Sequence, residues 1–342
     1  MTRKEKSTVT IYDVARRAGV AISTVSRVLN DSNDVSDKTR SEVEQAIDEL
    51  RFRPSRTARS LAQQEYHSFA VALPSFTAPF QNELLKGIRS YIREPGLDLL
   101  ICDLGSKNVE KSLRSFLQRG SVRGLMICGV PLSKSLTNEL IDSLSPTVLV
   151  GSQSEHFDSF YWDDARGIQL STEHLLKQGH RELCLICSVI DSEAKQRRIA
   201  GFRTALLAGG IEFDDSRIVS GEIGYHSGHS EEDGFDAMQK AFDRFPHITG
   251  VVASSDVLAI GAMMAIKDRG CSIPDDVAIV GYDDIKTSRF IGLSSVDLGM
   301  QAIGFQAAKQ VYGRVKGDIL GPPIEHIVQP TLEIRASSLR HR

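Results

Sequence analysis

The stretch VTIYDVARRAGVAISTVSRVLN, residues 9–30, decides how the N-terminal part of the chain folds. Thr10 and Asp13 form a T-x-x-D capping box, which predicts a helix that begins at about Ile11. Apolar residues then recur at helical spacing up to Gly19, where a left-handed residue would end that helix. A continuous helix would carry a glycine penalty of about 1 kcal/mol in its middle, with no visible gain. The spacing therefore predicts two short helices that meet at Gly19, a helix-turn-helix.

A third helix follows and completes a small core. Ser36 can cap it, and one face is apolar at i, i+3, i+4 and i+7: Val43, Ala46, Ile47 and Leu50. The second helix then exposes Ile22, Ser23, Ser26 and Arg27 on its outer face. In a DNA-binding unit this helix enters the major groove, whereas the spacing alone also fits a helical hairpin with an ordinary polar surface.

These elements continue into VSDKTRSEVEQAIDELRFRPSRTARSLA at residues 35–62, and together they resemble the headpiece of the lactose-repressor (LacI/GalR) family of bacterial transcription regulators. The resemblance implies phosphate contacts, which set the register on DNA, from Thr10, Tyr12, Thr24, Ser26 and Asn30. It implies base-edge contacts from Ile22, Ser23 and Arg27. An arginine that binds guanine O6 and N7 contributes about 1–3 kcal/mol of discrimination, and an isoleucine can offer only apolar contact.

A basic segment, SRTARSLA at Ser55–Ala62, follows the third helix. It is compatible with a helix but too short to be a stable one in water. A basic run can be a solvated face or a phosphate-binding patch. The resemblance implies a hinge that folds on DNA, with two copies in the minor groove and contacts from Ser55, Ala58 and Leu61. Leu61 would wedge a base step; the alternative is a linker residue packed on the core.

From Phe69 onward, short apolar runs alternate with helical stretches, which predicts parallel sheets covered by helices. The expected strands are FAVAL, LDLLIC, GLMIC, TVLV, ELCLIC, GVVA and VAIVG, with helices at 80–93, 166–178, 196–208 and 256–269. So many strands fit two α/β halves with a cleft between them, and ligands of such folds bind at the carboxyl ends of the strands.

Four further segments extend the resemblance over nearly all of residues 69–340: LLKQGHREL, RIAGFRTAL, IPDDVAIVGYDDI and TLEIRASS. The implied fold is a small all-α helix-turn-helix headpiece plus two α/β subdomains of periplasmic-binding-protein-like fold. The expected ranges are 8–54 for the headpiece, 55–65 for the hinge and 66–340 for an effector-binding and dimerisation core. Within that core we expect an N-subdomain at about 66–163 and 295–325, and a C-subdomain at about 164–294 and 326–340.

The same resemblance implies an effector site built from Ser75, Phe80, Arg198, Ser255, Asp256 and Asp283. Arg198 would bind ligand oxygens, as arginine is suited to do, and Asp283 would accept from ligand hydroxyls. The ordinary alternatives are that Asp256 only caps a helix and that Arg198 pairs with a surface acid. There are two departures from the family: Gly151 and Ser152 stand where many sugar-responsive members have Asp or Arg, and Ser255 replaces the usual Asn. They point to an atypical ligand, or to a phosphorylated compound or a partner protein in place of a sugar.

Other functional classes lack their signatures. The chain has no G-x-G-x-x-G after a strand, P-loop, H-E-x-x-H or G-x-S-x-G, so we expect no catalytic residue, no cofactor and no enzyme activity. Cys184 and Cys187 form a lone C-x-x-C on a predicted strand, where they point to opposite faces, so no metal is expected. Reduced cysteines in apolar runs, no signal sequence and no membrane span indicate a cytoplasmic, nucleoid-associated protein.

We therefore expect a homodimeric transcriptional regulator, taken as a repressor, that binds a near-palindromic operator. A small sugar-like effector in the cleft would control it. A sugar-binding receptor is the second hypothesis, which the headpiece and the missing signal sequence oppose; an α/β enzyme using the same cleft is the third. The sequence does not identify the effector or the operator. It also leaves open whether the effector acts as an inducer or a co-repressor, whether the protein represses or activates transcription, and whether it forms a dimer or a tetramer.

Overall fold

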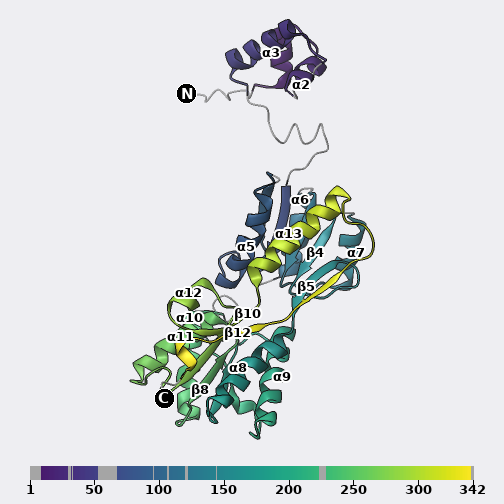
Figure 1. Ribbon diagram of the computed structural model, residues 1–342. Helices are drawn as coiled ribbons and strands as arrows, with labels where there is room; N and C mark the ends of the chain where they lie inside the picture. The colour runs from purple at the N-terminus through teal and green to yellow at the C-terminus, as the bar shows by residue number, and fades with distance from the viewer. Residues whose placement is uncertain are drawn as a thin grey trace, which may run out of the picture. The chain divides into compact units, whose positions relative to one another are not determined.

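The structure, a computed structural model, describes residues 9–29, 32, 34–52, 68–94, 96–105, 108–119, 122–143, 145–222 and 229–339 (Figure 1). The chain divides into two compact units, Met1–His67 and Ser68–Arg342. Four residues expected to contact DNA lie outside the described residues: Asn30, Ser55, Ala58 and Leu61. Their roles stay predictions.

The first unit contains the predicted pair of helices and the third helix: α1 (Ile11–Ala18), α2 (Ile22–Leu29) and α3 (Asp37–Leu50). The carboxylate of Asp13 accepts hydrogen bonds from the backbone N–H of Thr10 at 2.9 Å and from its hydroxyl at 2.7 Å. Gly19 has φ 68°, the left-handed conformation that ends α1. The helix-turn-helix is confirmed, and the glycine is its corner.

Six small or β-branched side chains form the core of this unit: Val14, Ala15, Val25, Val28, Val43 and Ala46. The hydroxyl of Ser36 accepts from the backbone N–H of Thr39 at 3.3 Å and caps α3 as predicted. An ion pair between Arg17 and Glu49 joins α1 to α3. All three helices therefore share one buried centre, which leaves the opposite face of α2 free for other contacts.

The second unit begins with a six-stranded parallel sheet in the order β11-β5-β4-β3-β1-β2. Its strands are β1 (Ser68–Leu73), β2 (Asp98–Asp103), β3 (Gly124–Cys128), β4 (Thr147–Val150), β5 (Asp158–Trp162) and β11 (Glu325–Val328). The helices of this half are α5 (Pro79–Ile92), α6 (Val109–Arg119), α7 (Lys134–Asp142) and α13 (Met300–Lys316).

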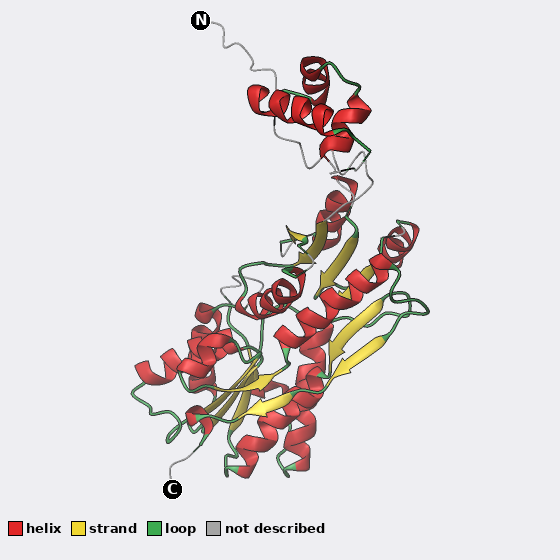
Figure 2. Ribbon diagram, turned by 45° about the horizontal axis from the view of Figure 1, so that its top comes forward, coloured by secondary structure: helices red, strands yellow, loops and turns green. Residues whose placement is uncertain are grey.

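A second six-stranded sheet follows in the order β12-β10-β9-β8-β6-β7, parallel except for β12. Its strands are β6 (Leu183–Ile186), β7 (Ile218–Val219), β8 (Gly250–Ala253), β9 (Ala278–Tyr282), β10 (Ser294–Asp297) and β12 (Thr331–Glu333). Its helices are α8 (Asp164–Lys177), α9 (Glu193–Ala208), α10 (Glu231–Arg244), α11 (Asp256–Asp268) and α12 (Lys286–Phe290). Figure 2 shows helices on both sides of the strands, so the predicted pair of α/β halves is confirmed.

The chain passes between the two halves three times. The first passage lies between Trp162, which ends β5, and Asp164, which begins α8. The second follows β10, and the third lies between β11 and β12. The expected limits at 295 and 326 fall inside β10 and β11. The strand pairing places both passages later in the sequence than these expected limits, because β10 lies wholly in the second sheet and β11 wholly in the first.

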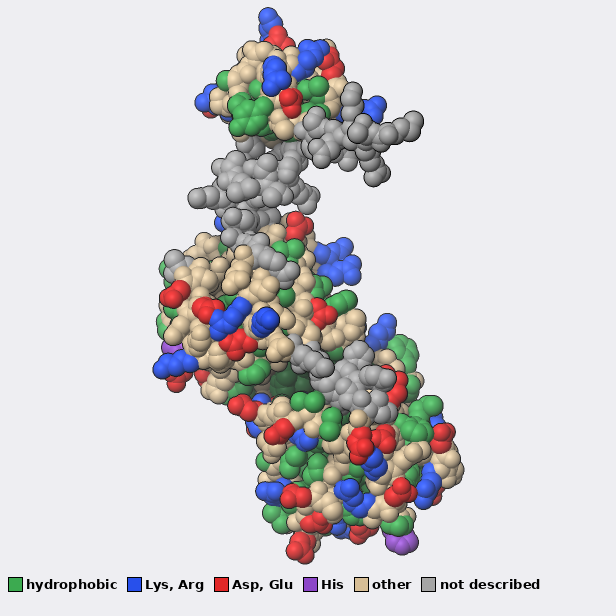
Figure 3. Space-filling view, turned by 180° about the vertical axis from the view of Figure 1, so that it is seen from behind, with side chains coloured by type: hydrophobic (Ala, Val, Ile, Leu, Met, Phe, Trp, Pro, Cys, Tyr) green, Lys and Arg blue, Asp and Glu red, His purple; other side chains and the backbone are tan. Residues whose placement is uncertain are grey.

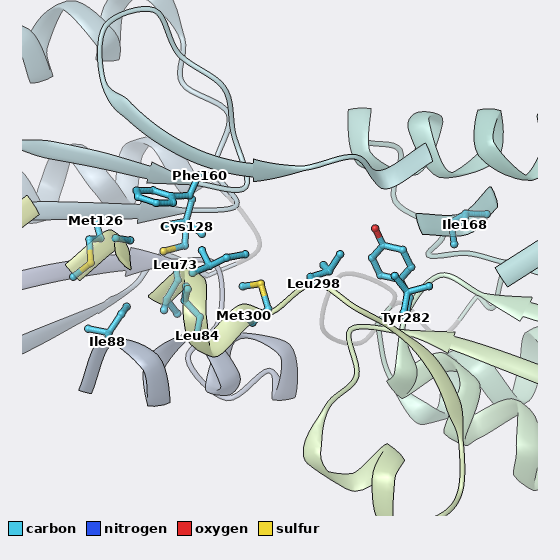
Figure 4. Close-up of a cluster of buried hydrophobic side chains, with 14 of the residues drawn as sticks. Leu73, Leu84, Ile88, Met126, Cys128, Phe160, Ile168, Tyr282, Leu298 and Met300 are labelled. Carbon is cyan, nitrogen blue, oxygen red and sulfur yellow. The ribbon is translucent and has the colours of Figure 1, made fainter. Parts of the chain in front are cut away.

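Helices α5 and α13 pack almost backbone to backbone. A Cβ on Gly87 would lie 2.0 Å from the carbonyl oxygen of Gln301, and one on Gly304 would lie 2.2 Å from that of Leu84. Figure 4 shows the buried side chains of this half beside Leu298 and Met300, which lie on the second passage, and Tyr282 beyond them. The close packing holds the second passage against α5.

Within the described part of the chain, no helix has the length and apolar character needed to span a membrane.

Candidate DNA-binding and effector sites

The outer face of α2 carries the residues expected to read DNA. Val25 and Val28 are buried on the inner face, whereas Ile22 is 40% exposed and Ser23 and Arg27 are exposed. The expected phosphate contacts lie beside them: Thr10 is exposed, Tyr12 is 62% exposed, and Thr24 and Ser26 are partly buried. The described members of the predicted set are thus all exposed or partly buried, so none is shut inside the core of the first unit.

The start of α2 has no side-chain cap of the usual kind. The carbonyl oxygen of Ala21 accepts from the backbone N–H groups of Thr24 at 2.9 Å and Val25 at 3.2 Å. Its methyl group cannot accept a further bond, whereas Ser36 does so at the start of α3. In the described part of the chain no hydrogen bond engages the N–H groups of Ile22 and Ser23, so these two are available to water or to a phosphate.

In the second unit, Arg198 of α9 is held by the protein on two sides. Its Nε donates to Oδ1 of Asp164 at 2.9 Å, and its Nη1 donates to the carbonyl oxygen of Ser254 at 2.7 Å. Its guanidinium lies 4.3 Å from the ring centroid of Tyr282. Burial would lower the pKa of Arg198, but Asp164 and further acidic groups raise it above its ordinary value. The partner of Arg198 is thus a buried carboxylate and not a surface acid.

Asp164 accepts hydrogen bonds from other side chains besides Arg198. It is 3% exposed at the start of α8, directly after the first passage between the halves. Its Oδ1 also accepts from Trp162 Nε1 at 3.3 Å and from the hydroxyl of Tyr282 at 3.2 Å, and its Oδ2 accepts from Arg197 Nη2 at 3.2 Å. One carboxylate therefore positions four side chains from β5, α9 and β9.

Phe80 faces this group from the first half. Its ring packs edge-on against Trp162, with centroids 5.9 Å apart and an interplanar angle of 74°. Ser75 precedes it in the loop after β1, where its hydroxyl lies 3.0 Å from that of Thr77 and its N–H donates to Gln81 at 3.2 Å. Among the described residues no hydrogen bond links Ser75 to Asp164. The structure thus connects Phe80 to the Arg198 cluster and leaves Ser75 apart.

Asp283 follows β9 in a strained turn. It has φ 110° and Asp284 has φ 45°, conformations that cost about 1–3 kcal/mol each for residues other than glycine. The N–H of Asp283 donates to the carbonyl oxygen of Val296 at 2.9 Å. Burial raises the pKa of Asp283 well above its ordinary range, although nearby Arg198 opposes this. A strained, buried acid beside an arginine is typical of a functional site.

Asp256 is fully buried and fully engaged. Its Oδ1 accepts from Ser295 at 2.6 Å, and its Oδ2 accepts from the hydroxyl of Ser288 at 2.7 Å and the N–H of Ile285 at 2.9 Å. Burial raises its pKa to about 6. The helix cap expected of Asp256 is supplied by Ser255, whose hydroxyl accepts from the N–H of Leu258 at 3.3 Å. Asp256 therefore ties down the turn that carries Asp283.

Three members of the site were not expected from the sequence: Asp164, Trp162 and Tyr282. A signal did exist, because the chain has a single tryptophan and it stands where a strand meets a helix cap. His229 was also missed. Its Nδ1 lies 3.5 Å from the hydroxyl of Ser255, and burial and Arg198 lower its pKa to about 4. Figure 3 shows a hollow with hydrophobic side chains between the two halves of this unit.

The described residues contain no group of three or more His, Cys, Asp or Glu side chains arranged to hold a metal ion. Cys184 and Cys187 are buried, and burial raises the pKa of their thiols to about 12 and about 11. Thiols of this kind are inert.

Comparison with known proteins agrees with both units. Residues 10–55 match the bacterial regulatory proteins of the lacI family, and residues 172–338 match the periplasmic binding protein-like domain. The chain is 34% identical over 282 residues to the HTH-type transcriptional regulator DegA of Bacillus subtilis (strain 168), covering 80% of this chain and 81% of that protein.

Two solved structures show the same fold over almost the whole chain. The CelR–cellobiose complex has 28% identity and a TM-score of 0.69, over 96% of this chain and 99% of that one. The lac repressor dimer, bound to operator and the anti-inducer ONPF, has 26% identity and a TM-score of 0.80, over 98% of this chain and 100% of that one. The chain therefore belongs to the lacI family of bacterial regulatory proteins, and it is a DNA-binding transcriptional regulator and not an enzyme.

Proposed function

We propose that this regulator binds a near-palindromic operator as a homodimer and that a sugar-like effector, held around Arg198 and Asp283, changes its affinity for that operator. The observation that carries the proposal is the division of α2 into a buried face of Val25 and Val28 and an exposed face with Ile22, Ser23 and Arg27. The solved lac repressor, which is similar over nearly the whole chain, is a dimer on its operator. Such a protein works at the chromosome, in the cytoplasm.

Sequence recognition would come from few side chains. Arg27 is exposed and can form paired hydrogen bonds with a guanine, whereas Ile22 offers apolar contact to a thymine methyl. Tyr12, Thr10 and the first turn of α2 would bind phosphate groups and set the register. The identity of the operator would therefore depend on Ile22, Ser23 and Arg27 more than on the other contacts.

The effector cluster suits a ligand with several hydroxyl groups. Arg198 is held in place by Asp164 and Ser254, and Asp283 lies near it with a raised pKa. Trp162 and Phe80 add an aromatic wall of the kind that packs on sugar rings. The similar regulator CelR is solved with cellobiose, which supports a sugar as the ligand class.

The cluster also offers a route from effector to DNA. Phe80 belongs to the first half, whereas Arg198 and Tyr282 belong to the second, and Trp162 touches both sets. A ligand bound there would contact both halves and favour one arrangement of them. It can shift the regulator only by its difference in affinity for the two states. The hinge expected at 55–65 would carry that change to the headpieces.

The DNA part is tested by selecting binding sites from a random library and measuring affinities by fluorescence anisotropy. Arg27→Ala should lower affinity for the selected site by about 1–3 kcal/mol and relax its preference for one base pair. Arg16→Ala, at another exposed arginine on α1, should leave that preference unchanged. Selection of no palindromic sequence by the intact protein would refute the proposal.

The hinge expectation has its own test. Leu61→Gly should weaken specific binding far more than binding to non-specific DNA, because the wedge acts only where the base step opens. An equal loss on both DNAs would remove Leu61 from this role.

The effector part is tested by a thermal-shift screen of sugars on the full chain. A ligand at 100 times its Kd adds about 2.7 kcal/mol of stability. Arg198→Gln should abolish both the shift and the effect of the sugar on operator affinity, and leave operator binding itself intact. An unchanged sugar response in this variant would remove Arg198 from the site.

A further inference from the structure

The C-terminal segment Arg335–Ser338 is built into the second half of the second unit by its own side chains. It follows β12, which pairs with β10 (Figure 1), and it ends the motif TLEIRASS of residues 331–338. The hydroxyl of Ser337 donates to the carbonyl oxygen of Ile279 in β9 at 2.7 Å, and Ser337 and Ser338 are buried. A segment fixed in this way can hold neighbouring residues in place.

Arg335 is the charged residue of this segment, and its direction is set by β10 and by the residue before that strand. Its N–H donates to the hydroxyl of Ser294 at 2.8 Å, and its Nη1 donates to the carbonyl oxygen of Leu293 at 2.7 Å. The same Nη1 lies 2.7 Å from Oδ1 of Asp284, and the side chain of Arg335 is only 18% exposed. The guanidinium is therefore held against Asp284 from within the protein.

Asp284 is a buried acid, with a side chain that is 1% exposed, directly after Asp283. Its Oδ2 accepts from Nε of Arg289 at 3.1 Å, but that arginine side chain is 57% exposed. An ion pair that is open to water is screened and weak, so Arg289 restrains Asp284 less than Arg335 does. Loss of the more buried partner should therefore affect Asp284 most.

The turn at residues 283–285 needs such a restraint. Asp283 and Asp284 have φ 110° and 45°, backbone conformations that residues other than glycine keep only where the surrounding structure holds them. The three N–H groups of the turn each donate to a group of the second half, at 2.9 to 3.0 Å. The ion pair with Arg335 adds a restraint on a side chain, and it acts on the residue next to Asp283.

We propose that Arg335 is a positioning residue of the effector site, which fixes Asp284 and thereby the direction in which Asp283 faces the ligand. The inference rests on the proposed function, because that function makes Asp283 a ligand contact. Among the described residues Arg335 forms no hydrogen bond or ion pair with Asp283 or Arg198, so its effect passes through Asp284. The C-terminal segment therefore contributes to sugar affinity through the shape of the site and not as a ligand contact.

The test uses the full chain and a thermal-shift screen of mono- and disaccharides that includes cellobiose. The sugar with the largest shift is then titrated by calorimetry. Arg335→Gln should weaken its binding about tenfold, close to 1.4 kcal/mol, and leave operator affinity without sugar unchanged. Arg335→Lys keeps the positive charge, so it should recover part of the loss.

A double variant shows whether Arg335 acts through Asp284. Asp284→Asn should weaken sugar binding by a similar factor. The variant with both changes should lose little more affinity than either single variant, because both changes remove the same ion pair.

Arg217→Gln is the matched control for a purely structural loss. The side chain of Arg217 is 14% exposed, its Nη1 donates to the carbonyl oxygen of Leu183 at 3.0 Å, and it lies 3.8 Å from Oε2 of Glu182. It is therefore similar to Arg335, but it is bound to β6 and not to the turn of Asp283. This variant should lower the stability to chemical denaturation as Arg335→Gln does, and leave sugar affinity unchanged.

The inference is overturned if Arg335→Gln binds the sugar as tightly as the unchanged protein, or if Arg217→Gln weakens sugar binding equally. It is also overturned if the losses caused by Arg335→Gln and Asp284→Asn add in full. Each of these outcomes leaves the proposed function standing. If the unchanged protein binds no sugar in the screen, the proposed effector site fails, and this inference fails with it.

Discussion

At the scale of single residues, the proposed effector site depends on a carboxylate that the motifs did not indicate. Arg198 could be assigned from the word RRIAGF, but the acid that holds it lies 34 residues earlier, beside the passage between the halves. Local patterns describe neighbours along a helix or strand, and Asp164 meets Arg197, Arg198 and Tyr282 only through the fold.

Asp164→Asn removes the charge opposite Arg197 and Arg198 while keeping the shape of the side chain. We expect the free energy of unfolding of the second unit to fall by about 3 kcal/mol, because a buried charge loses its partner. Sugar affinity should fall as well, and operator affinity without sugar should stay the same. Chemical denaturation and the thermal-shift titration measure these effects.

Glu193→Gln is the control for this variant. Glu193 also pairs with Arg197, at 3.5 Å, but its side chain is 91% exposed, so its loss should change stability little. If both variants lower the free energy of unfolding by the same amount, Asp164 is not the centre of the site.

The pH dependence of stability is also decided by single residues. Burial and Arg198 lower the pKa of His229 to about 4, and burial lowers that of His174. In the unfolded chain a histidine has a pKa of about 6.5, so below that pH the unfolded state binds more protons. The contribution of His229 is therefore complete above about pH 6.5 and is lost as the pH falls towards 4.

The melting temperature of the protein should accordingly decrease as the pH is lowered from 7 to 5. His229→Gln should flatten this slope, whereas His156→Gln, at an exposed position, should not. The same slope in both variants would show that other groups set the dependence.

At the scale of elements, the two units need glycine for different physical reasons. Gly19 has a left-handed backbone, and no atom lies within 4 Å of the Cβ that a substitution would add. Gly87 is an ordinary helical residue, but its Cβ would lie 2.0 Å from a backbone oxygen of α13. The first glycine is needed for its conformation and could be recognised from spacing. The second is needed for the contact between α5 and α13, which spacing does not reveal.

Gly19→Ala should therefore destabilise the first unit by about 1 kcal/mol, the usual cost of a left-handed residue with a Cβ. Gly87→Ala should cost the second unit more, because α5 and α13 must move apart. Hydrogen exchange measured on the full chain would show in which unit each variant loses stability. A smaller loss at Gly87 than at Gly19 would contradict this account of the helix pair.

At the scale of the whole molecule, two compact units of very different size share one chain. The first unit has a core of six small or β-branched side chains, whereas the second has three larger buried clusters. Since stability follows buried apolar surface, the units should unfold separately, the smaller one first.

Calorimetry on the full chain should then show two transitions. Operator DNA should raise the first, and sugar the second, because a ligand stabilises the part that it binds. A single transition that both ligands raise equally would mean that the units unfold together.

The sequence by itself determined the kind of protein. Helical spacing, one glycine and a capping box define the helix-turn-helix, because each acts within a few residues along the chain. Alternating apolar runs define the two α/β halves in the same way. Only the tertiary structure decided which carboxylate holds Arg198, that Asp256 is fully engaged, and that Arg335 pairs with Asp284. These groups are far apart in the chain, and long-range packing alone sets the distances between them.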